Sequence, residues 1–154
     1  AQRLGVPFIE LDRLIEQEYG ARISDLVEIA GLATFRRYER GCLDRVIAEH
    51  DAAVIATAGG IVSSPETYGL LLRRTHTVWI KARPEEHMHR VMAQGDFRPM
   101  ARNREAMSDL VAILDARSAD YARADAALDT SGDAEPDSFR KLMQLAKRYV
   151  GDTR

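Results

Sequence analysis

The pair Gly59-Gly60 follows residues 52–58, a nearly uninterrupted apolar run of strand length. A run without polar alternation is typical of a strand buried on both faces of a parallel sheet. Ligands of open α/β sheets bind just outside the carboxyl ends of strands, where glycine lets an anion approach backbone N–H groups without meeting a Cβ. A strand-to-helix turn that needs a positive φ explains the pair equally well. The sequence leaves both interpretations open.

Two carboxylates stand close together near the start of the chain. Glu10 and Asp12 end the apolar stretch 6–12, and residues two apart on a strand point to the same side. Asp12 also precedes residues 13–20, which are expected to form a short helix closed by glycine. It could therefore equally be the N-cap of that helix.

A third carboxylate, Glu39, falls on the apolar stripe of an expected helix. A buried carboxylate is costly unless it is paired, and Arg36 stands one turn before it. The pair could be purely structural, or it could also hold a ligand. Cys42 lies on the same stripe and is expected to be a small core residue, because nothing nearby would lower its pKa. The other members of the stripe are Phe35, Tyr38, Leu43, Val46 and Ile47.

Residues 94–104 interrupt the regular pattern with a glycine, a proline and three arginines, the first of which is Arg98. Such a segment is either a solvated linker or a mobile lid that brings an arginine over an anion. Arg117 falls on or beside the apolar face of the long helix expected to follow.

The elements that must position these residues alternate between strands and helices. This order predicts an α/β fold of three layers, a parallel sheet with helices on both faces. The expected strands are 6–12, 52–58, 76–82 and 126–130; the expected helices are 13–20, 24–29, 35–47, 65–74, 84–93, 104–124 and 136–150.

Length and composition limit the function classes. The 154 residues suit one domain, and a formal net charge of −2 gives no whole-chain attraction to nucleic acid or to an anionic membrane. A single cysteine excludes an internal disulfide and favours a reducing, cytoplasmic setting. No apolar run approaches the ~20 residues of a membrane span, so no membrane partner is expected.

Five short motifs, taken in order, resemble those of shikimate kinases. They are residues 8–12 (FIELD), 35–39 (FRRYE), 57–60 (TAGG), 97–99 (FRP) and 115–121 (DARSADY). The resemblance implies a P-loop kinase architecture and a ligand site for a cyclic polyol acid.

On the ligand side, the resemblance implies that Asp12 binds the hydroxyls and helps to deprotonate the one that attacks. Arg36 and Arg117 would clamp the carboxylate, which suits the fork of arginine. Gly59 and Gly60 would supply backbone N–H groups, and Glu39 would steady Arg36.

On the nucleotide side, the resemblance makes Arg98 the lid arginine that meets the transferring phosphoryl group. Arg90 stands near the position of an adenine-side arginine, and Glu10 replaces the usual aspartate near the magnesium. ATP and Mg²⁺ are therefore the implied cofactors, on condition that a phosphate loop exists.

Two further departures from the family pattern matter. Ala58 replaces the first of three glycines, and no Gly-x-x-x-x-Gly-Lys-Ser/Thr occurs anywhere in the sequence. Without that loop nothing here cradles the β- and γ-phosphates, so these residues alone should not transfer phosphate from ATP. In this family the strand before the loop lies in the middle of the sheet, so we expect the strand and loop upstream of Ala1.

The amino-acid sequence of residues 53–104 most resembles the C-terminal shikimate-kinase-like domain of XRE-type helix-turn-helix transcriptional regulators, which sense benzoyl-CoA. The favoured interpretation is therefore that residues 1–154 form a ligand-sensing domain. DNA would be bound only through an upstream domain, the effector would be benzoyl-CoA or a shikimate-like acid, and the intact regulator would be a homodimer. The alternative is a shikimate kinase that transfers phosphate from ATP to shikimate. A domain without any ligand, in which the charged residues only form an ion network, is the third possibility.

Overall fold

The structure is a computed structural model that describes residues 1–93 and 103–149. The described chain divides into two compact units, residues 1–76 and 77–149, and each is described here by itself. No helix of the described residues is long and apolar enough to cross a membrane. That residues 1–154 form one domain of a longer protein stays a prediction.

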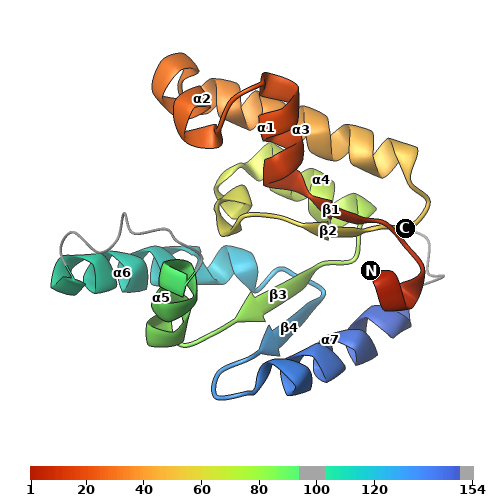
Figure 1. The fold of residues 1–154 in the computed structure, drawn as a ribbon, viewed down its shortest axis with the longest axis vertical. Helices are drawn as coiled ribbons and strands as arrows, with labels where there is room; N and C mark the ends of the chain where they lie inside the picture. Colours follow the sequence, from red (N-terminus) through yellow and green to blue (C-terminus); the bar gives the residue numbers. More distant parts are fainter. Residues whose placement is uncertain (94–102, 150–154) are drawn as a thin grey trace. The chain divides into compact units, whose positions relative to one another are not determined.

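The first unit places a bundle of helices beside a pair of strands (Figure 1). Strands β1 and β2 run parallel, with Phe8 opposite Val54 and Glu10 opposite Ala56. Helix α3 contacts each of α1, α2 and α4. The elements are η1 (Gln2–Leu4), β1 (Phe8–Glu10), α1 (Leu11–Tyr19), α2 (Ile23–Ala30), α3 (Leu32–Glu49), β2 (Val54–Ala56), η2 (Gly59–Ser63) and α4 (Pro65–Arg74).

The core of this unit forms around α3. Leu11 and Ile15 from α1, Leu26 from α2 and Leu43 from α3 are at most 1% exposed. Burying each such side chain stabilises the fold by roughly 1.5–3 kcal/mol. The contacts therefore fix α3, which carries Arg36 and Glu39, against two other helices.

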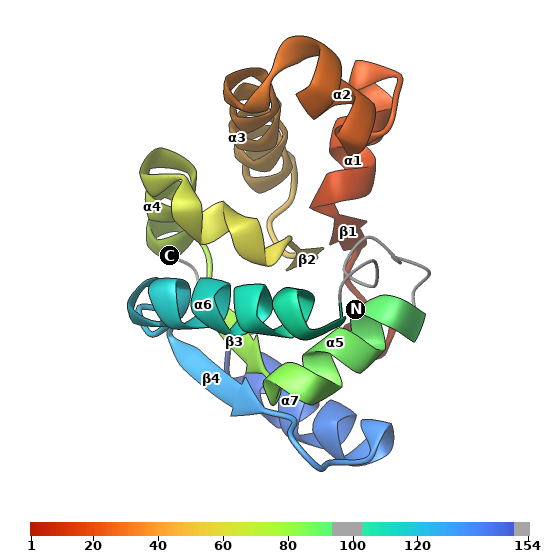
Figure 2. The ribbon, with the colours of Figure 1, turned by 90° about the vertical axis from the view of Figure 1, so that its left-hand side faces the viewer.

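The second unit contains β3 (Val78–Lys81), α5 (Pro84–Ala93), α6 (Asn103–Tyr121), β4 (Ala126–Asp129) and α7 (Glu135–Tyr149). Strands β3 and β4 are parallel, and Figures 1 and 2 show α6 and α7 on opposite sides of them. Trp79 stacks on Tyr121 with ring centroids 5.3 Å apart, which fixes α6 on its side. Oδ2 of Asp125 accepts hydrogen bonds from the backbone N and Oγ1 of Thr77, at 2.7 and 2.9 Å, so it joins the beginnings of both strands.

The α/β class with parallel strands and covering helices is confirmed, and the helix boundaries differ little from those expected. The strands are shorter, and they pair two by two. This pairing is what the absence of a phosphate-loop strand from the sequence leads us to expect. The expected burial of β2 on both faces is wrong, since Val54 and Ile55 are only half-buried.

The prediction for the two N-terminal acids also needs correction. Asp12 does not share a strand with Glu10, and it is not the N-cap: Glu10 is the N-cap of α1, and Asp12 lies in its first turn. The chain turns helical directly after the three residues that pair with β2.

Candidate functional site

The first unit contains a buried ion pair on α3. Nη1 of Arg36 donates to Oε2 of Glu39 at 2.7 Å, and Glu39 is only 1% exposed. Burial raises the pKa of Glu39 even though the hydrogen bond from Arg36 lowers it, and the nearby charge of Asp12 adds to the rise. A buried carboxylate needs a compensating charge, and Arg36 supplies it to Glu39.

The same guanidinium also reaches the glycine pair. A Cβ added to Gly60 would lie 3.5 Å from Nη2 of Arg36, while the Cζ atom lies 5.1 Å from the centroid of the Phe35 ring. One guanidinium nitrogen thus faces Glu39, and the other faces the backbone at Gly60. This is an arrangement in which an anion could contact both the arginine and the backbone.

The φ angles decide between the two explanations of the glycine pair. Among the described glycines, positive φ values occur at Gly5, Gly20, Gly31 and Gly132. Gly59 and Gly60 begin η2 without one. A turn that needs a positive φ is therefore the wrong explanation, and close approach to the backbone is the one that the geometry favours.

Asp12 is the titratable neighbour of the ion pair between Arg36 and Glu39. Burial raises its pKa most, followed by the negative charges of Glu16 and Glu10. Because Asp12 also raises the pKa of Glu39, the two carboxylates lie close enough to interact. A half-buried carboxyl group with a raised pKa is a candidate for proton transfer. Glu10 itself is half-buried and pairs with Nε of Arg13 at 3.0 Å.

The structure therefore brings together Asp12, Arg36, Glu39 and Gly60 within one unit. Arg117 belongs to the second unit, where it lies on the half-buried face of α6 with Leu114 and Tyr121. That Arg117 joins the Arg36 group stays a prediction. Arg98 lies outside the described residues.

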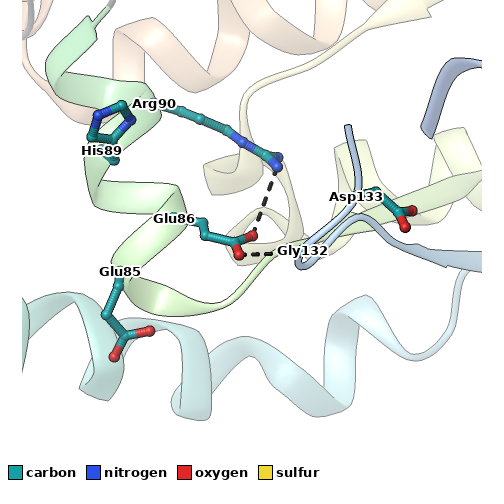
Figure 3. Close-up of a pocket in the computed structure, with 6 residues that line it drawn as sticks. All are labelled: Glu85, Glu86, His89, Arg90, Gly132 and Asp133. Carbon is teal, nitrogen blue, oxygen red and sulfur yellow. Dashed lines mark hydrogen bonds and ion pairs between the residues drawn. The ribbon is translucent and has the colours of Figure 1, made fainter. Parts of the chain in front are cut away.

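The second unit has a pocket of its own, with a volume of about 420 Å³. It lies beside the segments that follow β3 and β4, the ends at which α/β proteins bind ligands. Nη1 of Arg90 donates to Oγ1 of Thr130 at 3.0 Å, which ties α5 to the turn after β4. Figure 3 shows the lining residues, which are Glu85, Glu86, His89, Arg90, Gly132 and Asp133.

Of these residues, only Arg90 was expected at a ligand site. The missed signal is the turn Thr130-Ser131-Gly132-Asp133, which follows a strand just as Gly59-Gly60 does. Gly132 has a φ of 71° and is the glycine whose conformational freedom this turn uses.

Comparison with known proteins identifies the family. A family model described as shikimate kinase matches residues 1–147. The chain belongs to the shikimate kinase family. It is 32% identical over 146 residues to a shikimate kinase of Synechococcus sp. (strain CC9605), covering 93% of this chain and 72% of that protein. It is 34% identical over 156 residues to a shikimate kinase of Gloeobacter violaceus, covering 99% and 85%.

Solved structures of the family have the same fold. A shikimate kinase from Bacteroides thetaiotaomicron matches with a TM-score of 0.84 at 26% identity, over 95% of this chain and 86% of that one. A shikimate kinase from Acinetobacter baumannii, solved in complex with shikimate, matches with a TM-score of 0.83 at 27% identity, over 96% and 82%. The predicted P-loop kinase architecture is thereby confirmed.

These matches overturn the favoured interpretation from sequence. The interpretation as the ligand-sensing domain of a transcriptional regulator, with DNA binding and a benzoyl-CoA effector, is wrong. The upstream helix-turn-helix domain and the homodimer stay predictions. The family model and the relatives above are shikimate kinases, and they match nearly the whole chain. The short motifs could not distinguish a shikimate kinase from a shikimate-kinase-like regulator domain, because both would carry them. The comparison over residues 1–147 supports the kinase family.

Proposed function

We propose that this chain acts as a shikimate kinase, which transfers the γ-phosphoryl group of ATP to a hydroxyl group of shikimate. The observation that carries the proposal is the group of Asp12, Arg36, Glu39 and Gly60 in the first unit. It combines a proton acceptor with an oriented guanidinium beside a glycine backbone. Membership of the family, and the similar protein solved with shikimate, support it.

Arg36 is proposed to bind the carboxylate of shikimate. Glu39 holds one of its terminal nitrogens, so the guanidinium is oriented before the substrate arrives and loses little freedom on binding. We propose that Arg117 supplies the second half of the clamp, and that Gly59 and Gly60 contribute backbone N–H groups.

Asp12 is proposed as the residue that accepts the proton of the attacking hydroxyl. A carboxyl group with a raised pKa is a stronger base than an ordinary aspartate, which favours proton transfer near neutral pH. As the new O–P bond forms and the bond from the γ-phosphorus to the bridging oxygen breaks, the hydroxyl proton moves to Asp12 and ADP leaves.

The pocket in the second unit is proposed to hold the base of ATP against Arg90. Carboxylates outnumber the one guanidinium among its lining residues, so a negatively charged phosphate group would be repelled there and an uncharged base would not. Arg98 is proposed to contact the transferring phosphoryl group.

Mg²⁺ is held in such enzymes by one or two carboxylates together with substrate phosphates and water. The side chain of Glu10 is 41% exposed and the charges of Glu10 and Asp12 interact, so these residues fit a partly hydrated cation. We propose Glu10 as the residue that holds it, which requires Glu10 to release Arg13. The ion, when bound, would neutralise charge on the phosphates.

The sequence contains no Gly-x-x-x-x-Gly-Lys-Ser/Thr. The proposed reaction therefore needs a phosphate cradle from residues outside these 154, and ADP release should be measured on the complete gene product. Shikimate binding can be measured on the present chain by calorimetry, with the methyl ester of shikimate as the control that lacks a carboxylate. Binding of shikimate but not of its ester is expected. Failure to bind shikimate, or binding the ester equally well, would contradict the proposed site.

A further inference from the structure

Glu86 links two segments that are far apart in the sequence. Its Oε1 atom accepts hydrogen bonds from Nε and Nη2 of Arg83, at 3.1 and 2.5 Å, and from the backbone N of Gly132 at 3.0 Å. Gly132 lies 46 residues further along the chain, in the turn after β4. The first turn of α5 is thereby tied to the opposite wall of the pocket.

The other oxygen of Glu86 faces Arg90. Oε2 is buried and has no hydrogen-bond partner among the described residues, and Nη2 of Arg90 lies 3.9 Å from it. Figure 3 shows the Arg90 side chain extended toward this carboxylate and the Gly132 turn. Nη1 of Arg90 is held by Thr130, so both ends of the guanidinium have neighbours in this unit. The Arg90 side chain is still 47% exposed, and an exposed guanidinium can stack on an aromatic ring.

The charge of Glu86 favours its contact with Arg90. Hydrogen bonds from Arg83 and from the backbone of Gly132 lower its pKa, and the charge of Arg90 adds to the effect. The carboxylate is therefore ionised at neutral pH and attracts Arg90 over a distance that is too long for a hydrogen bond.

We propose that Glu86 is a positioning residue for the nucleobase, because it holds Arg90 and the Gly132 turn in place as the two walls of the pocket. The inference rests on the proposed nucleotide-binding role of Arg90. It adds that Glu86 acts through Arg90 and does not itself contact the base, since its free oxygen is buried.

The test uses adenosine, which carries no phosphate and so needs no phosphate loop. Its binding to the chain is titrated by NMR, following the backbone amide of Gly132 and the Nε signal of Arg90. Glu86→Gln keeps an oxygen for the Gly132 N–H but loses the charge that faces Arg90. We expect it to weaken adenosine binding about two- to fivefold, the range for an ion pair between partly exposed side chains. Asp137→Asn, which removes the carboxylate of another i,i+3 arginine pair in the same unit, is the matched control and should bind as wild type does.

The double variant separates positioning from general damage. If Glu86 acts through Arg90, Glu86→Gln should have no further effect in an Arg90→Met background, and the Nε signal of Arg90 should shift or broaden in Glu86→Gln without ligand. Additive losses, or wild-type affinity in Glu86→Gln, would overturn the role of Glu86 and leave the base site intact. A wild-type chain that does not bind adenosine would overturn both this role and the proposed base site. Thermal unfolding of each variant shows whether a loss reflects the fold.

Discussion

The hydrogen bond from Nη1 of Arg36 to Oε2 of Glu39, at 2.7 Å, joins a partly exposed arginine to a carboxylate that is almost completely buried. The two residues therefore play unequal parts. Glu39 depends on Arg36 for charge compensation, whereas Arg36 keeps a second nitrogen directed at Gly60. The pair is both a structural contact of α3 and an oriented cation for a ligand.

Replacing Arg36 with methionine should destabilise the chain by about 3–5 kcal/mol at neutral pH, since it leaves a buried charge without a partner. In this variant the pKa of Glu39 lies further above its unfolded value. The folded state then binds the proton more tightly, and the lost stability returns as the pH falls through the folded pKa. Urea unfolding between neutral and acidic pH measures this.

Arg37→Met is the matched control. Arg37 stands beside Arg36 on α3, and its hydrogen bond to Oγ1 of Thr34 is exposed. Its loss should change the free energy of unfolding by about 0.5 kcal/mol or less. A loss for Arg36→Met that does not diminish at low pH would contradict the dependence of Glu39 on Arg36.

Replacing Asp12 with asparagine should raise the melting temperature and abolish phosphoryl transfer. The raised pKa means that the ionised carboxylate of Asp12 is less favourable in the folded chain than in the unfolded one. At pH values above the folded pKa, removing the charge therefore stabilises the fold, while the proposed proton acceptor is lost. Calorimetric unfolding and ADP release measure the two effects.

Glu16→Gln tests the electrostatic cause of that shift. The negative charge of Glu16 raises the pKa of Asp12, while Oε1 of Glu16 accepts from the backbone N of Ile23 at 3.0 Å, a bond that glutamine can keep. The acid limb of the pH–rate profile should therefore move to lower pH in Glu16→Gln. An unmoved limb would show that Asp12 is not the group whose ionisation limits the rate.

Much of this site could be predicted from the sequence where the signal is local. The 3.6-residue period of α3 placed Glu39 on the buried face with Arg36 one turn away, and both are found there. Strand β2 is shorter and less buried than expected. The burial of a strand depends on which elements cover it, and a run of apolar residues does not reveal them. The pocket was missed for a related reason: Glu86 and Gly132 meet only in three dimensions, 46 residues apart along the chain.

Replacing Gly60 with alanine should leave the fold intact and weaken shikimate binding by about tenfold or more. The added methyl group would keep the ligand from its proposed position against the Gly60 backbone. The new methyl group would lie 3.5 Å from Nη2 of Arg36, an ordinary contact, and Gly60 needs no positive φ. Calorimetric titration with shikimate measures the loss. Gly41→Ala on α3 is the control, since nothing lies within 4 Å of its added Cβ, and it should stabilise the helix by about 0.5–1 kcal/mol without affecting binding.

Cys42 offers a direct measure of how ligand binding protects the first unit. Cys42 is 1% exposed, and burial together with the nearby Glu18 raises the pKa of its thiol to about 11. Native Cys42 should therefore react with a thiol reagent only after the unit opens, and a ligand that binds the folded form alone should slow labelling by a factor of one plus its concentration over its Kd. Shikimate is expected to slow labelling of the wild type but not of Arg36→Met, because the latter lacks the proposed carboxylate contact. Equal protection of both proteins would place the shikimate site away from Arg36.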